Sequence, residues 1–379
     1  MPIAIRAVGT ALPANAYPQR YVRDVMGRWI GGDRRTDKLL DRVYAASAID
    51  ERHSVLADFL AEPNGEDETP FLAGDGRFRS PSTGERNALY ALHAPGLAER
   101  SAVAALANAA GFAAGDVTHL ITVTCTGFMT PGTDLHLVRA LGLGPHVERY
   151  HLGFMGCFAA FPALRMAHAF CAADAAAVVL IVTVELCTLH LQPARDVDSV
   201  LAASVFADGA AAALVTARPP RSSAADGGET PQRALALERS ATAVTREGAS
   251  DMAWTIGDHG FDMKLTAYVP RVIEAEASEV LAPLFGDGVT PADVRWWAVH
   301  PGGRAIVDKV AGALALDEAA VAASRSVLRR AGNMSSATVL FVLEELMDAQ
   351  QAGPAPGELV AALAFGPGLT VDSALLRAL

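Results

Sequence analysis

Two stretches of this sequence decide the fold that it predicts: Val123-Thr124-Cys125-Thr126-Gly127 and Ala298-Val299-His300-Pro301-Gly302-Gly303. Each is an apolar run that enters a glycine-bearing loop, as is typical where a buried strand ends. About 32 residues after Cys125 and after His300, a glycine precedes a polar or reactive residue, as Gly156-Cys157 and as Gly332-Asn333. A repeated order with a repeated offset indicates an internal duplication, although unrelated strand–helix units can share an offset by coincidence.

Apolar runs of strand length alternate with alanine-rich stretches of helix length along the chain. This alternation predicts an α/β fold built from stacked layers. Segment 218–229 is rich in turn-forming residues and is expected to be an exposed connector between two halves, 1–217 and 234–379. The expected strands are 3–8, 120–123, 178–184, 210–215, 234–237, 296–299 and 359–364, and the expected helices are 99–110, 157–173, 271–284 and 335–350.

The composition excludes several classes of protein. Hydrophobic residues make up 51% and charged residues 19% of the 379 residues, which is incompatible with intrinsic disorder. The net charge of −11 argues against a nucleic-acid partner, because such proteins need a basic surface. No basic segment followed by a long apolar run marks the N-terminus as a secretory signal. The longest apolar stretch, 175–184, is about half the length of a membrane span.

The cysteines point to a reducing compartment. Four are too few for a disulfide framework in a chain of this length, and none forms a Cys-x-x-Cys pair that would indicate structural zinc. We therefore expect a cytoplasmic protein with free thiols. The four are Cys125, Cys157, Cys171 and Cys187.

Cys157 is the first candidate for chemistry. Glycines at 153 and 156 let the chain turn sharply before a helix, and Pro162 fits only the first turn of that helix. A thiol at a helix N-terminus faces the positive end of the dipole, which favours the thiolate. Taken alone, Cys157 is more typical of a buried structural cysteine.

His300 and Asn333 change this interpretation. Each has an ordinary explanation, since His300 follows an apolar strand as a core histidine can, and Asn333 suits a helix cap. If the two halves are related by duplication, however, Cys157 and Asn333 occupy equivalent positions and the strand ends deliver Cys125 and His300 to the same centre. A thiol, an imidazole and a carboxamide suffice for acyl transfer.

Four motifs now resemble the signatures of type III polyketide synthases, the chalcone synthase-like enzymes. They are Gly156-Cys157-Phe158, His300-Pro301-Gly302-Gly303, Gly332-Asn333-Met334-Ser335-Ser336 and Phe365-Gly366-Pro367-Gly368-Leu369, and they follow the family's order over nearly the whole chain. The resemblance implies a thiolase-like fold with two pseudo-symmetric α-β-α-β-α halves. It also implies a homodimer.

The resemblance implies a mechanism as well. Cys157 would carry a starter acyl group from coenzyme A as a thioester. His300 and Asn333 would stabilise the enolate formed when malonyl-CoA loses carbon dioxide, and this enolate would attack the acyl group. No cofactor is implied beyond the malonyl-CoA and acyl-CoA substrates, and no metal.

Further pocket positions follow from the resemblance. Phe206 matches the aromatic gatekeeper of the family, although it also suits an ordinary core position. Met263 stands where plant members have a second gatekeeping phenylalanine, and its slimmer, adaptable side chain predicts a wider mouth. Cys125 and Thr126 match the end of a pocket-lining strand. His190 falls near another pocket position, although two residues are missing after it.

The binding of the partner subunit and of coenzyme A rests on fewer matches. Thr130 matches a residue that plant enzymes insert into the partner's cavity. Arg42 matches one member of the basic cluster for coenzyme A, but Leu39 and Ala46 stand where that cluster has lysines. Gly366 and Pro367 belong to the C-terminal signature and are expected at the substrate pocket.

The starter is less constrained by the sequence. Thr126, Thr130, Ala202 and Ala203 are small and leave room for a long acyl chain, as in bacterial enzymes that make alkylresorcinols or alkylpyrones from fatty acyl-CoA. The stretch 254–260 also resembles that bacterial branch. A pocket that differs by the size of one methylene group changes substrate preference only modestly. The sequence therefore does not identify the starter.

Three other functions remain at this stage. A ketoacyl-acyl carrier protein synthase III shares the fold and the Cys-His-Asn set, but its His-Gln-Ala-Asn and Asn-Thr-Ser patterns are absent here. A non-catalytic acyl-CoA-binding scaffold has no need of Cys157, His300 and Asn333 together. A cysteine hydrolase would release free acid without decarboxylation.

Overall fold

The structure is a computed structural model that describes residues 1–57, 69–73, 77–221, 233–248, 251–266, 268–286 and 288–379. Nine strands form the main sheet in the order β11-β12-β13-β8-β1-β7-β6-β4-β5. Their bounds are β1 Ala4–Ala11, β4 His119–Thr124, β5 Glu148–Gly153, β6 Val178–Leu186, β7 Asp208–Thr216, β8 Leu235–Val244, β11 Trp296–Val299, β12 Leu359–Gly366 and β13 Thr370–Ala378.

The sheet repeats itself on either side of the β1–β8 contact. On the β1 side, β7 pairs antiparallel with β1, β6 pairs antiparallel with β7, and β4 pairs parallel with β6. From β8 outward, β13 and β12 are antiparallel and β11 is parallel to β12. The strands that precede Cys125 and His300 are therefore topological equivalents, which confirms the predicted fold of two pseudo-symmetric halves.

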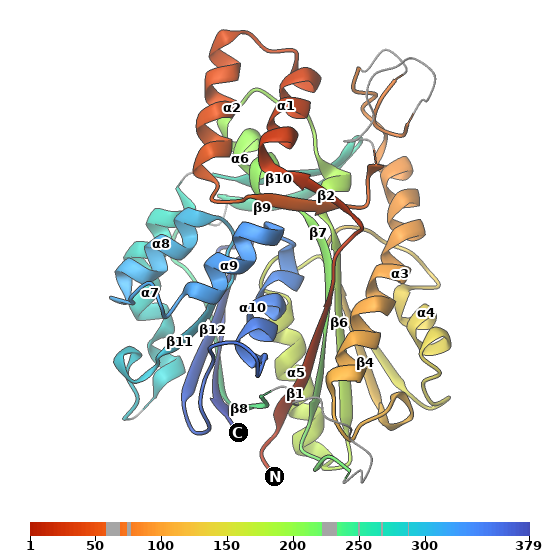
Figure 1. The fold of residues 1–379 in the computed structure, drawn as a ribbon, viewed down its shortest axis with the longest axis vertical. Helices are drawn as coiled ribbons and strands as arrows, with labels where there is room; N and C mark the ends of the chain where they lie inside the picture. The colour runs from red at the N-terminus through yellow and green to blue at the C-terminus, as the bar shows by residue number, and fades with distance from the viewer. Residues whose placement is uncertain (58–68, 74–76, 222–232, 249–250, 267, 287) are drawn as a thin grey trace.

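The two groups of strands lie in separate layers with helices between and outside them (Figure 1). The inner layer holds α5 (Ala160–Ala173) and α10 (Thr338–Met347). Helix α3 (Thr83–Asn108) covers the outer face of the first group of strands, and α7 (Val269–Phe285) and α8 (Arg304–Ala313) cover the second. The chain thus has alternating layers of helices and sheets around three buried clusters.

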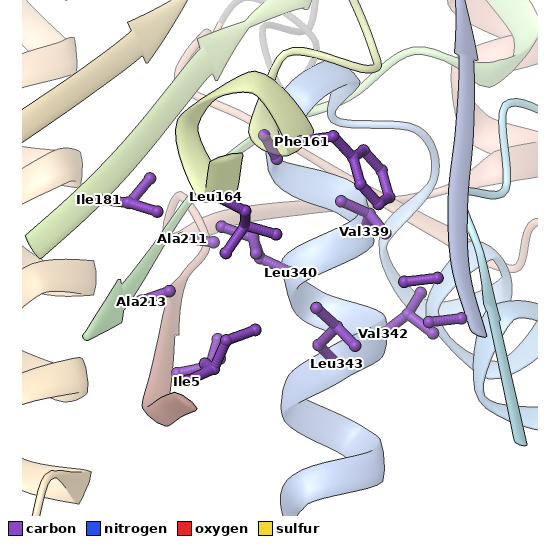
Figure 2. Close-up of a cluster of buried hydrophobic side chains, with 14 of the residues drawn as sticks. Ile5, Phe161, Leu164, Ile181, Ala211, Ala213, Val339, Leu340, Val342 and Leu343 are labelled. Carbon is purple, nitrogen blue, oxygen red and sulfur yellow. The ribbon is translucent and has the colours of Figure 1, made fainter. Parts of the chain in front are cut away.

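Strands β6 and β7 and most of helix α10 are apolar on all sides because other elements of the fold surround them. Every residue of β6 and β7 is buried, as expected for strands covered on both faces. Figure 2 shows side chains of α10, Leu340 and Leu343 among them, packed against Ile5 and Leu164. A helix that is hydrophobic all round belongs in the core.

The remaining elements gather mostly at one end of the molecule, where β9, β10, α1, α2 and α6 lie together (Figure 1). In the described part of the chain, no helix combines the length and apolarity needed to cross a bilayer. The expected connector lies outside the described residues from position 222 to position 229. The remaining bounds are β2 Asn15–Pro18, β3 Glu51–Ser54, β9 Met252–Gly257, β10 Gly260–Leu265, α1 Gln19–Ile30, α2 Arg34–Ala46, α4 Thr133–Ala140, α6 Val197–Val205 and α9 Ala322–Ala331.

Packing in the inner layer yields a prediction for stability. Leu340 on α10 is 0% exposed, so Leu340→Ala should lower the free energy of unfolding by about 2–5 kcal/mol, through lost burial and the cavity left behind. Urea denaturation followed by circular dichroism measures this change. Leu92→Ala on α3 is the matched control, because Leu92 is 70% exposed. An equal loss of unfolding free energy in the two variants would contradict the burial of α10 in the core.

Candidate active site

A cavity collects residues from both halves of the chain, and its space together with its open mouth is about 570 Å³. Cys157 comes from the turn before α5, His300 from the end of β11, and Asn333 from the segment between α9 and α10. The structure thus brings together the three residues that the sequence predicted to meet. The other lining residues are Cys125, Gly156, Phe206, Met252, Ala253, Trp254, Met263, Lys264, Leu265, Gly302, Ile306, Ser335, Phe365 and Pro367.

Cys157 lies in a tight turn between β5 and α5. Gly156 has a φ of +83°, a left-handed conformation that glycine adopts without strain. A Cβ added to Gly156 would lie 2.6 Å from Cδ of Pro367, so the proline ring can approach the turn only because residue 156 is glycine. Helix α5 begins at Ala160 rather than at Cys157 as predicted, because the turn continues through Phe158 and Ala159.

Burial dominates the acid–base chemistry of the Cys157 thiol. It raises the pKa of Cys157 to about 11, although hydrogen bonds with Ser335 and Asn333 favour the thiolate and lower the pKa. The expectation that the helix N-terminus favours the thiolate is therefore outweighed by burial. Attack by this sulfur requires a base that takes its proton.

His300 is the histidine that lines the cavity beside Cys157. Its side chain is buried, and neither ring nitrogen has a hydrogen-bond partner in the described residues. Burial lowers the pKa of His300 to about 3, so the imidazole is neutral and resists protonation unless a negative charge forms beside it. If the thiol proton moved to this ring, the resulting thiolate and imidazolium would stabilise each other as buried opposite charges.

Asn333 is held by its backbone on two sides. Its N–H donates to the carbonyl of Val205 and its carbonyl accepts from the N–H of Ala207, each at 2.8 Å. The side-chain Oδ1 accepts from the Ser335 N–H at 2.9 Å, and Nδ2 donates to the Gly302 carbonyl at 3.3 Å. Because the amide nitrogen carries two hydrogens, the one not used by Gly302 can donate to the Cys157 sulfur or, in its place, to a substrate oxygen.

Glu185, at the end of β6, is a buried residue that the sequence analysis missed. Its carboxylate accepts from the Cys125 N–H at 3.0 Å, from the Thr126 hydroxyl at 2.9 Å and from the Ser336 hydroxyl. Burial raises the pKa of Glu185. The residue ties the loop after β4 to the segment after Asn333, and the only signal in the sequence was a glutamate closing an otherwise apolar strand.

Aromatic rings form one side of the cavity. Phe206 meets Trp254 edge-on at a centroid distance of 6.3 Å, and Trp254 meets Phe261 in the same way at 6.1 Å. Phe261 stacks on His190 at 4.0 Å. Met263 lies directly across from Trp254 in the β9–β10 ladder and lines the cavity.

Five of the predicted site residues do not line this cavity. The Thr126 hydroxyl is buried and engaged by Glu185 and by the Leu186 N–H, and His190 lines a neighbouring cavity instead. Thr130 and Arg42 are exposed on the surface of this chain. Gly366 does not line the cavity either: a Cβ there would lie 2.2 Å from the Phe158 ring, so its role in the structure is to admit that ring.

Cys125 and Pro367 do lie at the cavity as predicted, with Phe206 and Met263. Cys125 Sγ lies 3.3 Å from Ser335 Oγ. Burial and the neighbouring Glu185 carboxylate raise the pKa of the Cys125 thiol. Two thiols therefore face one cavity, and only Cys125 has a carboxylate within hydrogen-bonding distance.

Comparisons with known proteins identify the family. Residues 2–219 match the N-terminal domain of the chalcone and stilbene synthases, and residues 236–379 match their C-terminal domain. Bisdemethoxycurcumin synthase of Oryza sativa subsp. japonica is 33% identical over 99% of this chain and 92% of that protein.

Two solved structures support the same family. The C-terminal type III polyketide synthase domain of Steely1 from Dictyostelium superposes with a TM-score of 0.87, and PKS-I of the brown alga Ectocarpus siliculosus with 0.88. Each is 27% identical and covers 100% of this chain and 99% of its own. The chain therefore belongs to the chalcone and stilbene synthase family and is a type III polyketide synthase, a condensing enzyme of the acyltransferase type.

Proposed function

We propose that this enzyme condenses malonyl-CoA extender units with an acyl-CoA starter carried as a thioester on Cys157. The observation that carries the proposal is the convergence of Cys157, His300 and Asn333 on one buried cavity from three separate segments. His300 takes the thiol proton, and the sulfur attacks the starter carbonyl with release of coenzyme A. The exposed Arg42 keeps its predicted part in this step, as a contact for the phosphates of coenzyme A.

Chain extension uses the same two side chains as donors. The malonyl carboxylate leaves as carbon dioxide, and its bonding electrons form an enolate whose charge rests on the thioester oxygen. The His300 imidazole and the free Asn333 N–H donate to that oxygen. One such donor in a buried site lowers a barrier by about 3–4 kcal/mol. The enolate carbon then attacks the acyl group on Cys157, and the thiolate is the leaving group.

Two features support a homodimer as part of this proposal. Strand β5 forms one end of the sheet order, so its outer edge has no strand neighbour among the described residues. An open edge of this kind can pair with a second chain. Thr130 lies in the exposed loop between β4 and α4, where it can reach a partner subunit. The division into halves 1–217 and 234–379 and the cytoplasmic location remain predictions.

The apolar lining of the cavity favours an acyl-CoA starter with a hydrocarbon chain, of the kind that yields alkylpyrones or alkylresorcinols. Incubation with malonyl-CoA and starters of increasing length, followed by mass spectrometry, tests the function. We expect products that exceed the starter by whole acetate units, with carbon dioxide released. Extension with malonyl-carrier protein alone would favour a carrier-protein-dependent synthase. Free acid without carbon dioxide would indicate a hydrolase, and no turnover a binding scaffold.

A further inference from the structure

Arg52, in β3, is a buried cation that holds one of the segments around the cavity. The residue is 3% exposed, and its Nη1 donates to the carbonyls of Ala203 at 2.7 Å and of Phe206 at 2.8 Å. We propose that Arg52 is a positioning residue for the decarboxylation of malonyl-CoA. Its guanidinium fixes the segment 203–207, which in turn holds Asn333. This inference rests on the proposed function, because it assumes that Asn333 donates to the enolate.

The two carbonyls that Arg52 binds lie where α6 ends. Helix α6 stops at Val205, and the last carbonyls of a helix have no partner within the helix and carry partial negative charge. A cation that donates to them therefore stabilises this end of α6. In the described part of the chain, Nε and Nη2 of Arg52 have no hydrogen-bond partner. Nη1 alone makes these contacts, while the guanidinium carbon lies 5.8 Å from the centre of the Tyr44 ring.

The segment that Arg52 fixes is paired with Asn333. Phe206 and Asn333 form a parallel bridge. In this bridge the Asn333 N–H donates to the Val205 carbonyl, and the Ala207 N–H donates to the Asn333 carbonyl, each at 2.8 Å. A displacement of the segment would therefore displace the backbone of Asn333, and its amide with it.

Arg52 also packs against the chain directly before Asn333. Gly332 has a φ of +73°, and a Cβ there would lie 3.1 Å from Cγ of Arg52 and 3.0 Å from the Val205 carbonyl oxygen. Glycine allows this close approach. Arg52 thus supports Asn333 through hydrogen bonds to one segment and through packing on another. Its own side chain is not among the described residues that line the cavity, so it acts through Asn333.

Two half-reactions separate positioning from general stability. Arg52→Met keeps a long unbranched side chain and removes the charge and both donated hydrogen bonds. We expect it to lower the release of carbon dioxide from malonyl-CoA about 10- to 100-fold, because a displaced donor stabilises the enolate less well. Acylation of Cys157 by a starter, measured as coenzyme A released in one turnover, should fall much less, because Cys157 and His300 lie on other segments.

A double-mutant cycle tests the route from Arg52 to the reaction. Asn333→Ala alone should lower decarboxylation about 100- to 1000-fold. If Arg52 acts through Asn333, Arg52→Met should lower decarboxylation little further in the Asn333→Ala background, so the two effects should not multiply. Arg52→Lys keeps a cation with three donors and should recover part of the decarboxylation that Arg52→Met loses.

Arg86→Met is the matched control for the loss of a buried arginine. Arg86 is 0% exposed and also donates to backbone carbonyls, those of Pro81, Leu189 and Leu191, which lie outside the segment 203–207. Thermal unfolding of Arg86→Met and Arg52→Met shows how much stability each loses. We expect Arg86→Met to change the two half-reactions in the same proportion.

Several outcomes overturn the inference. Equal losses in both half-reactions of Arg52→Met, or the same selective loss in Arg86→Met, would leave Arg52 with a role in stability alone. A full further loss in the Asn333→Ala background would show that Arg52 does not act through Asn333. A loss in Arg52→Lys as large as in Arg52→Met would show that the contact with the two carbonyls is not what matters. Wild-type decarboxylation in Asn333→Ala would contradict the proposed function, and this inference with it.

Discussion

Replacement of Cys157 by alanine should abolish chain extension and leave slow decarboxylation of malonyl-CoA. The sulfur carries the starter, so no acyl acceptor remains, and extension should fall below detection. His300 and Asn333 are still present to stabilise the enolate, which then takes a proton and becomes acetyl-CoA. The measurement is the release of carbon dioxide from carboxyl-labelled malonyl-CoA, with product analysis by mass spectrometry on the same samples.

The second thiol of the cavity provides the matched control. Cys125→Ala removes a sulfur that also lines the cavity, but whose neighbour is Glu185 rather than a neutral base. This variant should still extend a starter, with product length or rate altered by the change in cavity shape. Extension by Cys157→Ala, or its complete loss in Cys125→Ala alone, would transfer the role of nucleophile to Cys125.

Replacement of His300 by glutamine has the second large effect that we expect. It removes the base for Cys157 and one donor for the enolate, so malonyl-CoA decarboxylation should fall about 100- to 1000-fold. The thiol would also be left without a partner for its proton. Because burial raises the pKa of Cys157, alkylation of Cys157 by iodoacetamide in this variant should increase with pH up to at least about pH 9.

The direction in which the pH profile of Cys157 alkylation shifts separates a catalytic role of His300 from a structural one. In the wild type, transfer of the proton to His300 supplies thiolate at lower pH, so alkylation should reach its plateau earlier than in the variant. His168→Gln on the surface of α5 is the control and should leave both the plateau and the decarboxylation rate unchanged. Identical pH profiles in the wild type and in His300→Gln would remove His300 from the mechanism.

Much of the fold could be predicted from hydrophobic patterns alone. Strands such as β6 and β7 are continuous apolar runs because helices cover both of their faces, and such runs are visible without tertiary information. The boundaries were less accurate. Helix α3 begins at Thr83, well before the predicted start at 99, because Pro95 and several polar residues inside it interrupt the apolar pattern.

The sequence predicts those residues of the candidate site that have local signals and misses those that depend on distant contacts. Cys157, His300 and Asn333 stand beside glycines at the ends of regular elements, and these features are local. The β9–β10 hairpin that contributes Trp254 was not predicted, because its burial depends on contacts with segments distant in sequence. Thr126 was expected at the cavity, but its hydroxyl turns to Glu185, a partner that the sequence does not reveal.

The location of the starter acyl group tests the central claim most directly. The wild-type protein is incubated with an acyl-CoA starter without malonyl-CoA, digested, and its cysteine-containing peptides are examined by mass spectrometry. The account predicts that the acyl mass is found on the peptide that carries Cys157 and that it is removed by hydroxylamine. An acyl group on Cys125, or no acylated peptide under conditions in which the enzyme turns over, would contradict the account.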